Sequence, residues 1–416
     1  MNEGFDLLEH FELILDSDPL IDELGFIHQS QFDLLSKEAE SSEFESNDES
    51  LSRLNFWNKD HKLGIAVHVI LPLYKAAKEA FMNAVKQSKA VENSSLEDGF
   101  LSHESEVMKH SKAVLLLSCD FLTAWNSRKL ILSKKQHIPM FIEELLLSAL
   151  VLSFSPKSEQ AWCHRRWVIK MIAGKCSTMQ EILGKESELV EKIAERSKMN
   201  YRAWNHRCWL VSYMTKEQVL LELKKSGHWA RLHVADSSCF HYRTRLMLWI
   251  LEESCHKQED ESSDHDAEIY HIWQEELQWN KELIKHYVGR EALWLYRRFL
   301  SLCWIRHFAT DLSNSSRTSK CKTCIVTDIS LFMNNELCLV HSCSSIPDDS
   351  YEDSEAQAVH SSTYILWLAK QIPESQGIEL KKKLNAGNWK AVLNGACPGR
   401  SSLWDNLATD LEPSTK

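Results

Sequence analysis

Hydrophobic and polar positions in the middle of the chain follow the spacing of amphipathic helices. Trp204, Arg207 and Val211 fall on one face, because offsets of three, four and seven residues coincide on a helix of about 3.6 residues per turn. A second apolar face runs along residues 188–196, just before that helix. The pattern predicts helix, turn and helix in succession.

The same pattern returns along the chain. Five copies of a motif recur in which an aromatic residue is followed by arginine three positions later, and the aromatic residues of these copies are 37, 42, 36 and 54 residues apart. The longest interval contains the polar, acidic stretch 255–266, which we expect to form a solvated loop. A period of about 40 residues suits one helical hairpin that buries its apolar face against its neighbours. We therefore predict an all-α fold, an alpha-alpha superhelix in which hairpins stack as a solenoid crescent.

Each pair of aromatic residue and arginine could stabilise the packing of the hairpins or form part of a functional site. A tryptophan wedged between hairpins, with the arginine reaching a neighbouring carbonyl or carboxylate, would hold the stack together. We favour this structural interpretation for any single pair. The pairs are Trp125 with Arg128, Trp162 with Arg165, Trp204 with Arg207, Phe240 with Arg243, and Trp294 with Arg297.

The composition supports helices and narrows the class of partner. The 416 residues are 44% hydrophobic, but glycine and proline number only 12 and 8, fewer than a many-stranded sandwich or barrel needs for its turns. The formal net charge of -11 argues against a general nucleic-acid binder, because phosphate affinity requires clusters of lysine and arginine. We expect protein partners instead.

The sequence also predicts a cytoplasmic protein without a transmembrane segment. The most apolar run, residues 140–154, is interrupted by Glu143 and Glu144 and is shorter than the ~20 residues that cross a bilayer. The N-terminus has no basic region ahead of its apolar residues, so it does not resemble a secretory signal. Twelve cysteines scattered through a long chain are typical of reduced thiols.

Composition divides the chain into three parts. Residues 1–112 combine helices with acidic and serine-rich linkers, residues 113–305 carry the repeats, and residues 306–416 combine helices with loops rich in serine and aspartate. Outside the repeats we predict helices near 67–85 and 359–371, and a helix with a short second element within 1–36. The segments predicted to be disordered, linkers or loops are 37–50, 87–106, 310–320 and 342–355.

The residues around two of the motifs resemble a known family. The string Asn200-Tyr201-Arg202-Ala203-Trp204-Asn205-His206-Arg207 is similar to the Asn-Tyr-x-x-Trp-x-x-Arg signature of the protein prenyltransferase alpha-subunit repeat. Pro156-Lys157 followed by Trp162-Cys163-His164-Arg165 is similar to an adjacent copy, and the resemblance extends over about residues 115–302. It implies a chain that is inactive alone and wraps around a beta subunit folded as an alpha-alpha barrel.

The resemblance also implies a reaction. The beta subunit would carry the zinc, the isoprenoid pocket and most of the peptide site, whereas this chain would bind no cofactor alone. With an isoprenoid diphosphate as co-substrate, the pair would transfer a farnesyl or geranylgeranyl chain to a cysteine thiolate near the C-terminus of a protein substrate.

Three residues take the places of the family's polar groups near the diphosphate. Lys157 stands five residues before its tryptophan, where the resemblance implies an ammonium that stabilises charge on the departing diphosphate; the alternative is an ordinary surface lysine. Tyr201 matches an interface tyrosine, or is a half-buried hairpin residue. Arg202 replaces a histidine of the farnesyl-type subunit and keeps a donor there, whereas Glu159 replaces a tyrosine and would repel an anion.

The choice of lipid and partner follows from the motif strings. Those at Trp162 and Trp204 look nearer to the Rab-type repeats, so we hypothesise a Rab-type beta subunit and geranylgeranyl as the lipid. The alternative is a non-catalytic helical-repeat scaffold that binds proteins of membrane traffic, and Glu159 supports it. A tetratricopeptide-type peptide receptor is a third hypothesis, which we disfavour because the motif residues match the prenyltransferase repeat.

A separate set of side chains has the spacing of zinc ligands. Cys321 and Cys324 form a Cys-x-x-Cys pair, and Cys338 with His341 would complete a tetrahedral structural site. The apolar stretch 325–333 between the pairs favours a buried helix whose thiols pack in a core. We expect no metal in this chain, because the zinc implied by the resemblance belongs to the beta subunit.

Overall fold

The structure is a computed structural model in which helices predominate, as the all-α repeat fold requires. It divides into two compact units, residues 1–207 and 208–416, and the division falls within α9 (Tyr201–Leu210). The described residues are 3–32, 34, 55–92, 97–256, 264–308, 329–344, 352–372 and 389–409.

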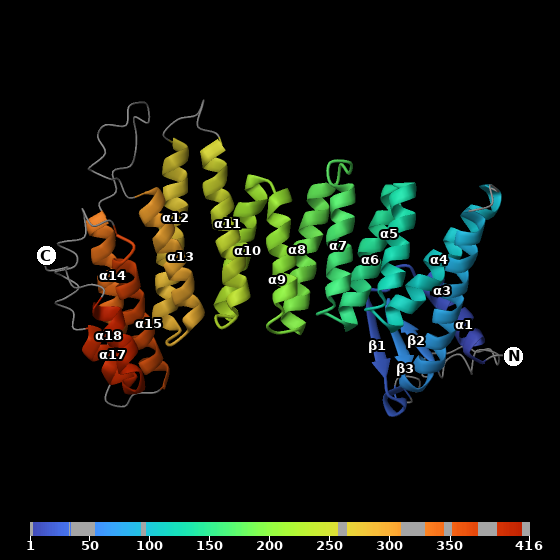
Figure 1. Cartoon of the computed structure of the whole chain (residues 1–416), viewed down its shortest axis with the longest axis horizontal. Helices are drawn as coiled ribbons and strands as arrows, with labels where there is room; N and C mark the ends of the chain where they lie inside the picture. Colours follow the sequence, from blue (N-terminus) through green and yellow to red (C-terminus); the bar gives the residue numbers. More distant parts are fainter. Residues whose placement is uncertain are drawn as a thin grey trace. The chain divides into compact units, whose positions relative to one another are not determined.

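The N-terminal unit is built mainly from helices joined by short turns (Figure 1). Within it, α3 packs on α4, α6 packs on α7, and α5 and α6 contact α7 and α8 in turn, as expected for stacked hairpins. These helices are α1 (Glu3–Ser17), α3 (Ile70–Glu92), α4 (Glu97–Leu117), α5 (Leu122–Lys135), α6 (Ile138–Phe154), α7 (Glu159–Ile172) and α8 (Met179–Arg196).

Local signals set the ends of these helices. The Ser158 hydroxyl accepts from the amide of Ala161 and caps the start of α7. The Asn200 side chain does the same for the amide of Ala203 at the start of α9. At the end of α5, Gln136 adopts a left-handed conformation with φ of 48°, which stops the helix. Both capped ends adjoin the candidate site.

A small mixed sheet lies in the N-terminal unit and was not predicted. Its strands are β1 (Glu23–Ile27), β2 (Phe56–Lys59) and β3 (Lys62–Ala66), in the order β1-β3-β2. The β1 strand is parallel to β3, and β2 is antiparallel to β3. The short second element predicted within 1–36 is therefore a strand. Its partner, β3, starts more than 30 residues after β1 ends, so no local pattern shows the pairing.

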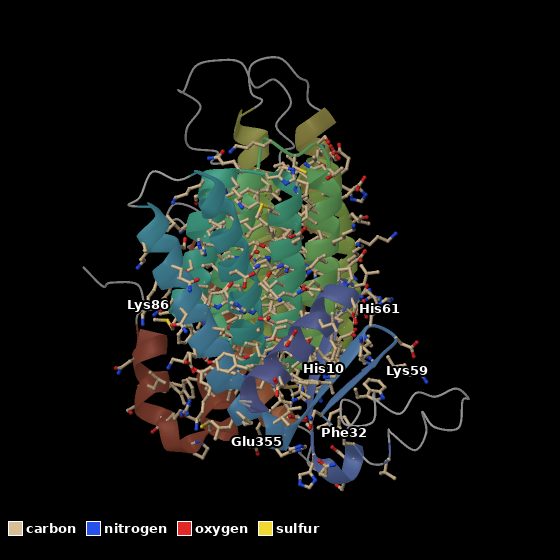
Figure 2. The ribbon with its side chains drawn as sticks, turned by 90° about the vertical axis from the view of Figure 1, so that its right-hand side faces the viewer. His10, Phe32, Lys59, His61, Lys86 and Glu355 are labelled. Carbon is tan, nitrogen blue, oxygen red and sulfur yellow. The ribbon has the colours of Figure 1, made fainter. Side chains whose placement is uncertain are left out.

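The sheet and α1 share one core with the first helices of the repeats. Phe11 of α1 stacks on Phe56 of β2, and His10 meets the same ring edge-on, in the region shown in Figure 2. The amide of Leu24 in β1 donates to the Ser153 hydroxyl of α6 at 3.1 Å. The short 3-10 helix η1 (Val67–Val69) connects β3 to α3. The sheet thus covers part of the first repeat.

The predicted linker at 87–106 is wrong. Helix α3 continues to Glu92, and α4 begins at Glu97. Glu104, Val107 and Ser111 are buried on one face of α4, three and four residues apart. The serine and glutamate content of this stretch concealed a helix whose packing face is partly polar.

The C-terminal unit continues with packed helices. The helix predicted near 359–371 begins earlier, and the loop predicted at 342–355 includes the first residues of that helix, so this boundary is wrong. The helices and 3-10 turns are η2 (Val211–Tyr213), α10 (Lys216–Leu232), α11 (Ser237–His256), α12 (Asp264–His286), α13 (Glu291–His307), α14 (Ile329–Cys343), α15 (Glu352–Ala369), α17 (Trp389–Ala396), η3 (Pro398–Arg400) and α18 (Ser401–Thr409).

Several predictions fall outside the described residues. These are the disordered run at 37–50, the loop at 310–320, and most of the solvated loop at 255–266, whose helical flanks are the end of α11 and the start of α12. Among the residues that the structure describes, no helix combines the length and apolar character needed to cross a membrane.

Candidate functional site

The motif residues lie in the core of each unit. The five aromatic side chains are at most 3% exposed, and the five arginines at most 5%. The indole of Trp125 donates to the carbonyl of Cys119, and that of Trp162 to the carbonyl of Pro156, in each case in the turn before its own helix. A buried indole with a satisfied N–H stabilises both the packing and the turn.

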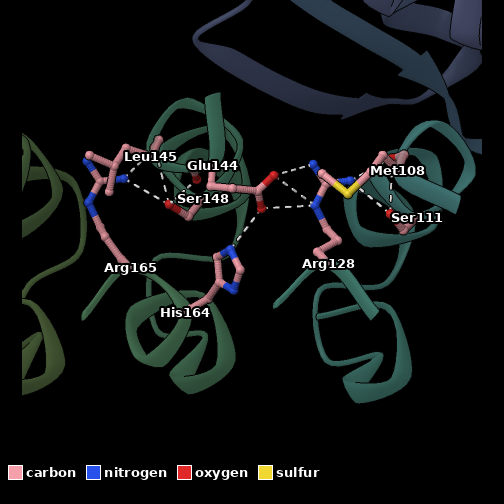
Figure 3. A network of polar contacts seen from close by, with 8 residues as sticks. All are labelled: Met108, Ser111, Arg128, Glu144, Leu145, Ser148, His164 and Arg165. Carbon is pink, nitrogen blue, oxygen red and sulfur yellow. Dashed lines mark hydrogen bonds and ion pairs between the residues drawn. The ribbon is translucent and has the colours of Figure 1, made fainter. Parts of the chain in front are cut away.

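Four of the five motif arginines bind a glutamate of a following helix, as Figure 3 shows for Arg128 and Glu144. Arg128 donates through Nε to Glu144 at 2.9 Å and through Nη1 to the carbonyl of Met108 and the hydroxyl of Ser111. The second Glu144 partner is His164, whose Nε2 lies 2.8 Å from Oε2. The Arg128 guanidinium and the Glu144 carboxylate therefore connect four successive helices, from α4 to α7.

The next copy repeats this arrangement. Arg165 donates through Nε to Glu186 at 2.6 Å, and its Nη1 lies 3.0 Å from the Ser148 hydroxyl. His206 Nε2 lies 2.9 Å from Glu186 Oε2. Arg207, the third motif arginine of this unit, donates to the Ser187 hydroxyl at 2.6 Å. The buried guanidinium groups of Arg128 and Arg165 are thus hydrogen-bonded and paired with a carboxylate, as burial demands.

In the C-terminal unit a tyrosine takes the place of the histidine. Arg243 and Tyr296 both bind the carboxylate of Glu276, the arginine through Nε at 2.9 Å and the phenol at 2.7 Å. Arg297 Nε donates to Glu336 at 2.9 Å, and the phenol of Tyr364 donates to the same carboxylate at 2.6 Å. Both units therefore use a ring side chain as the second donor to the buried glutamate.

These contacts set the protonation states in the N-terminal unit. Burial alone would raise the pKa of Glu144, but the charge of Arg128 and the hydrogen bond from His164 lower that pKa to about 2. The pKa of Glu186 is likewise about 2, because its arginine and histidine outweigh burial. Burial lowers the pKa of His164, so its ring is neutral when it contacts Glu144.

The sequence analysis missed the glutamates, although a signal for them exists. In four copies a bound glutamate precedes its histidine or tyrosine partner by 20 residues. The pairs are Glu144 with His164, Glu186 with His206, Glu222 with Tyr242, and Glu276 with Tyr296. A periodic glutamate within an otherwise apolar helix face marks the second half of the motif.

The three candidate catalytic residues lie together, in the N-terminal unit. Lys157 occupies the turn before α7, while Tyr201 and Arg202 begin α9. Arg202 Nη1 donates to the carbonyl of Lys157 at 2.9 Å, although the two are 45 residues apart. Tyr201 is 60% exposed, not half-buried, and its ring lies 5.4 Å from the guanidinium carbon of Arg202. The Lys157 side chain is also exposed.

Glu159 is part of the same cluster. Arg202 Nε donates to one oxygen of this carboxylate at 2.9 Å, and Arg166 Nη2 donates to the other at 3.0 Å. Burial would raise the pKa of Glu159, but hydrogen bonds from Cys163, Arg166 and Arg202 lower it. The carboxylate therefore stays charged, and the site combines one exposed ammonium with an arginine pair bound to an acid. Such a group of charges can bind an anion.

The described residues include two of the four candidate metal ligands. Cys338 and His341 lie on α14, and the His341 ring is 4.9 Å from that of Trp389. Cys321 and Cys324 lie outside the described residues. Among the residues described, no group of three or more histidine, cysteine, aspartate or glutamate side chains could hold a metal ion. The zinc hypothesis stays untested.

Comparison with known proteins identifies two of the repeats. The sequence pattern described as "Protein prenyltransferase alpha subunit repeat" matches residues 141–172 and 183–214, which include all of α7 and α9 and most of α6 and α8. Two segments of the chain are thus similar to the repeat of protein prenyltransferase alpha subunits. The matched segments contain the buried motif residues Trp162 and Trp204 and, at the start of α7 and α9, most of the charged cluster around Glu159.

Relatives of the family differ in how much they share with this chain. "Protein prenyltransferase alpha subunit repeat-containing protein 1" of Homo sapiens is 31% identical over 239 residues, 48% of this chain and 59% of that protein. Its namesake in Danio rerio is 29% identical over 275 residues, 57% of this chain and 63% of that protein. "Geranylgeranyl transferase type-2 subunit alpha" of Saccharomyces cerevisiae is 29% identical over 105 residues, 24% of this chain and 31% of that protein. The chain thus spans under two thirds of each.

Proposed function

We propose that this chain is the alpha subunit of a heterodimeric protein prenyltransferase. The observation that carries the proposal is the meeting of Lys157, Tyr201 and Arg202 at the start of α7 and α9. These two helices belong to the repeats that the family pattern matches.

The proposed chemistry of this chain is electrostatic. As the carbon–oxygen bond to the isoprenoid breaks, negative charge grows on the departing diphosphate, and an ammonium at Lys157 lowers the energy of that state more than that of the bound substrate. Tyr201, exposed at the start of α9, supplies a phenol that donates a hydrogen bond. The partner subunit supplies the isoprenoid pocket and a zinc ion that activates the acceptor thiol.

The proposed lipid is geranylgeranyl, and the proposed partner is a Rab-type beta subunit. Support comes from the motif strings at Trp162 and Trp204 and from the yeast relative, whose name describes a geranylgeranyl transferase subunit. The acceptor is a cysteine near the C-terminus of a protein substrate. Exclusive co-purification with a farnesyl-type beta subunit would reject this assignment.

Co-expression with each type of beta subunit tests the proposal. The complex is isolated, and transfer of labelled geranylgeranyl and farnesyl diphosphate to acceptor proteins is measured. We expect Lys157→Ala to pair normally and to lower transfer about 100-fold, the usual effect of removing one group that stabilises transition-state charge. Lys175→Ala is the matched control, because Lys175 is an exposed lysine beyond the far end of α7. Absence of any pairing would refute the proposal.

A non-catalytic scaffold is the second candidate, and one observation favours it. Glu159 binds both Arg166 and Arg202, so it cancels part of the positive charge that a diphosphate would meet. A scaffold tolerates Lys157→Ala without functional loss, whereas a transferase does not. A stable complex with either beta subunit that transfers no lipid would favour the scaffold.

A further inference from the structure

We propose that Arg202 is a positioning residue, which together with Glu159 holds the turn that carries Lys157. The inference rests on the proposed function, since its consequence for lipid transfer requires Lys157 to act at the diphosphate. It differs from the role implied by the family resemblance, in which the side chain at this position contacts the anion itself.

The geometry of Arg202 shows a bridge between two helices. Its Nε donates to Glu159, the first residue of α7, and its Nη1 donates to the carbonyl of Lys157, two residues earlier in the turn. Both distances are 2.9 Å. The planar guanidinium holds these two acceptors at a fixed separation, which a flexible ammonium cannot do. The start of α9 is thereby attached to both sides of the Lys157 turn.

A second contact from the start of α9 supports the same turn. Asn200 donates through Nδ2 to the carbonyl of Pro156 at 2.8 Å, and the indole of Trp162 donates to that carbonyl at 3.1 Å. The carbonyls of Pro156 and Lys157 are therefore both held by side chains rather than by the backbone ladder. Arg202 supplies the contact to Lys157 itself, so its loss releases the backbone of that residue.

The surroundings of Arg202 argue against direct contact with a diphosphate. Two of its nitrogens are already engaged, and the Glu159 carboxylate beside it is 45% exposed. An anion approaching the guanidinium would meet that carboxylate, which repels it. Among the described residues, no carboxylate forms an ion pair with the exposed ammonium of Lys157, which remains the group that can reach the anion.

Hydrogen exchange of the chain alone tests the positioning without any activity. The amide of Ser158 donates to the carbonyl of Ser155, and that of Ala161 to the Ser158 hydroxyl, so a peptide spanning 155–162 reports the turn. We expect Arg202→Ala and Glu159→Ala each to speed its exchange about fivefold, the effect of one lost hydrogen bond. Arg196→Ala is the control, because this exposed arginine binds Glu23 elsewhere in the unit. Unchanged exchange in both variants would refute the positioning role.

Transfer kinetics of the heterodimer then test the route through Lys157. We expect Arg202→Ala to lower kcat between about 10- and 100-fold, the range for a displaced catalytic group, and to leave the KM for the isoprenoid diphosphate nearly unchanged. In a Lys157→Ala background the same substitution should change kcat less than about twofold, because the group it positions is gone. Multiplicative effects of the two substitutions, or a raised KM, would show direct binding by Arg202 and refute the proposal.

The variant Glu159→Ala distinguishes a role in positioning Arg202 from simple repulsion of the diphosphate. If Glu159 orients Arg202, its removal slows transfer as Arg202→Ala does; if it only repels the diphosphate, its removal speeds transfer and refutes the proposal. Failure of the proposed function gives a different result. In that case Lys157→Ala transfers like the unmodified chain, or no complex transfers lipid, while the exchange measurement still decides whether Arg202 holds the turn.

Discussion

Removal of the Glu186 carboxylate is the sharpest test of the buried ion pairs. Glu186 accepts hydrogen bonds from Arg165 Nε at 2.6 Å and from His206 Nε2 at 2.9 Å, and it is 1% exposed. Glu186→Ala leaves the guanidinium of Arg165 buried without a counter-charge, because Arg165 is only 5% exposed and cannot reach water without unpacking α7. His206 loses its acceptor at the same time.

The expected cost is large relative to the stability of a domain. Breaking a buried ion pair by removing one partner costs about 3–5 kcal/mol, against a total of about 5–15 kcal/mol for a typical domain. The corresponding fall in the urea midpoint is about 1–3 M, given the usual dependence of stability on denaturant. Glu188→Ala is the matched control, because Glu188 is exposed on the same helix, α8, and its loss should cost under about 0.5 kcal/mol.

Urea unfolding of the full chain, followed by circular dichroism, measures the change. Hydrogen exchange of peptides from α7 and α8 locates it in the N-terminal unit. The double variant Arg165→Leu with Glu186→Leu should cost less than Glu186→Ala, because it removes both charges together. The reasoning is refuted if Glu186→Ala is no more destabilising than Glu188→Ala, since the pair would then contribute nothing measurable.

Three further predictions concern stability. The N-terminal unit should lose stability as pH falls. Because the pKa of His164 is lowered in the folded chain, only the unfolded chain takes up a proton at this residue as pH falls below the ordinary histidine pKa of 6.5. The Glu144 pKa of about 2 removes a further contribution to stability as pH falls from about 4.5 to 2. A urea midpoint that does not change between pH 7.5 and pH 4 would contradict this prediction. Trp162→Ala should cost about 3–5 kcal/mol because it empties a fully buried site, and thermal unfolding measures it against Trp162→Phe, which we expect to cost less. Ser158→Ala removes the cap of α7 and should cost about 1 kcal/mol, whereas Ser158→Asp should cost little; equal losses in both would exclude capping.

The sequence alone determined the class of fold and the place of the repeats. A 3.6-residue period is a local property, so residues three and four apart, such as Trp204 and Arg207, already reveal the buried face of α9. The recurrence of that face about every 40 residues then requires stacking, because one hairpin cannot bury its apolar side alone. The strings around Trp162 and Trp204 also carry the resemblance to the prenyltransferase repeat, and the matched segments contain both.

Only the tertiary structure decided which distant residues meet. Glu186 binds Arg165 21 residues away, and Arg202 binds the Lys157 carbonyl 45 residues away. The sequence suggested Glu159 and Arg202 as opposing influences on an anion, whereas the structure pairs them at 2.9 Å. Such contacts depend on how hairpins dock, and parallel pairing of β1 with β3 depends on a connection that no local period encodes. Periodicity specifies which face is buried; only packing specifies what that face touches.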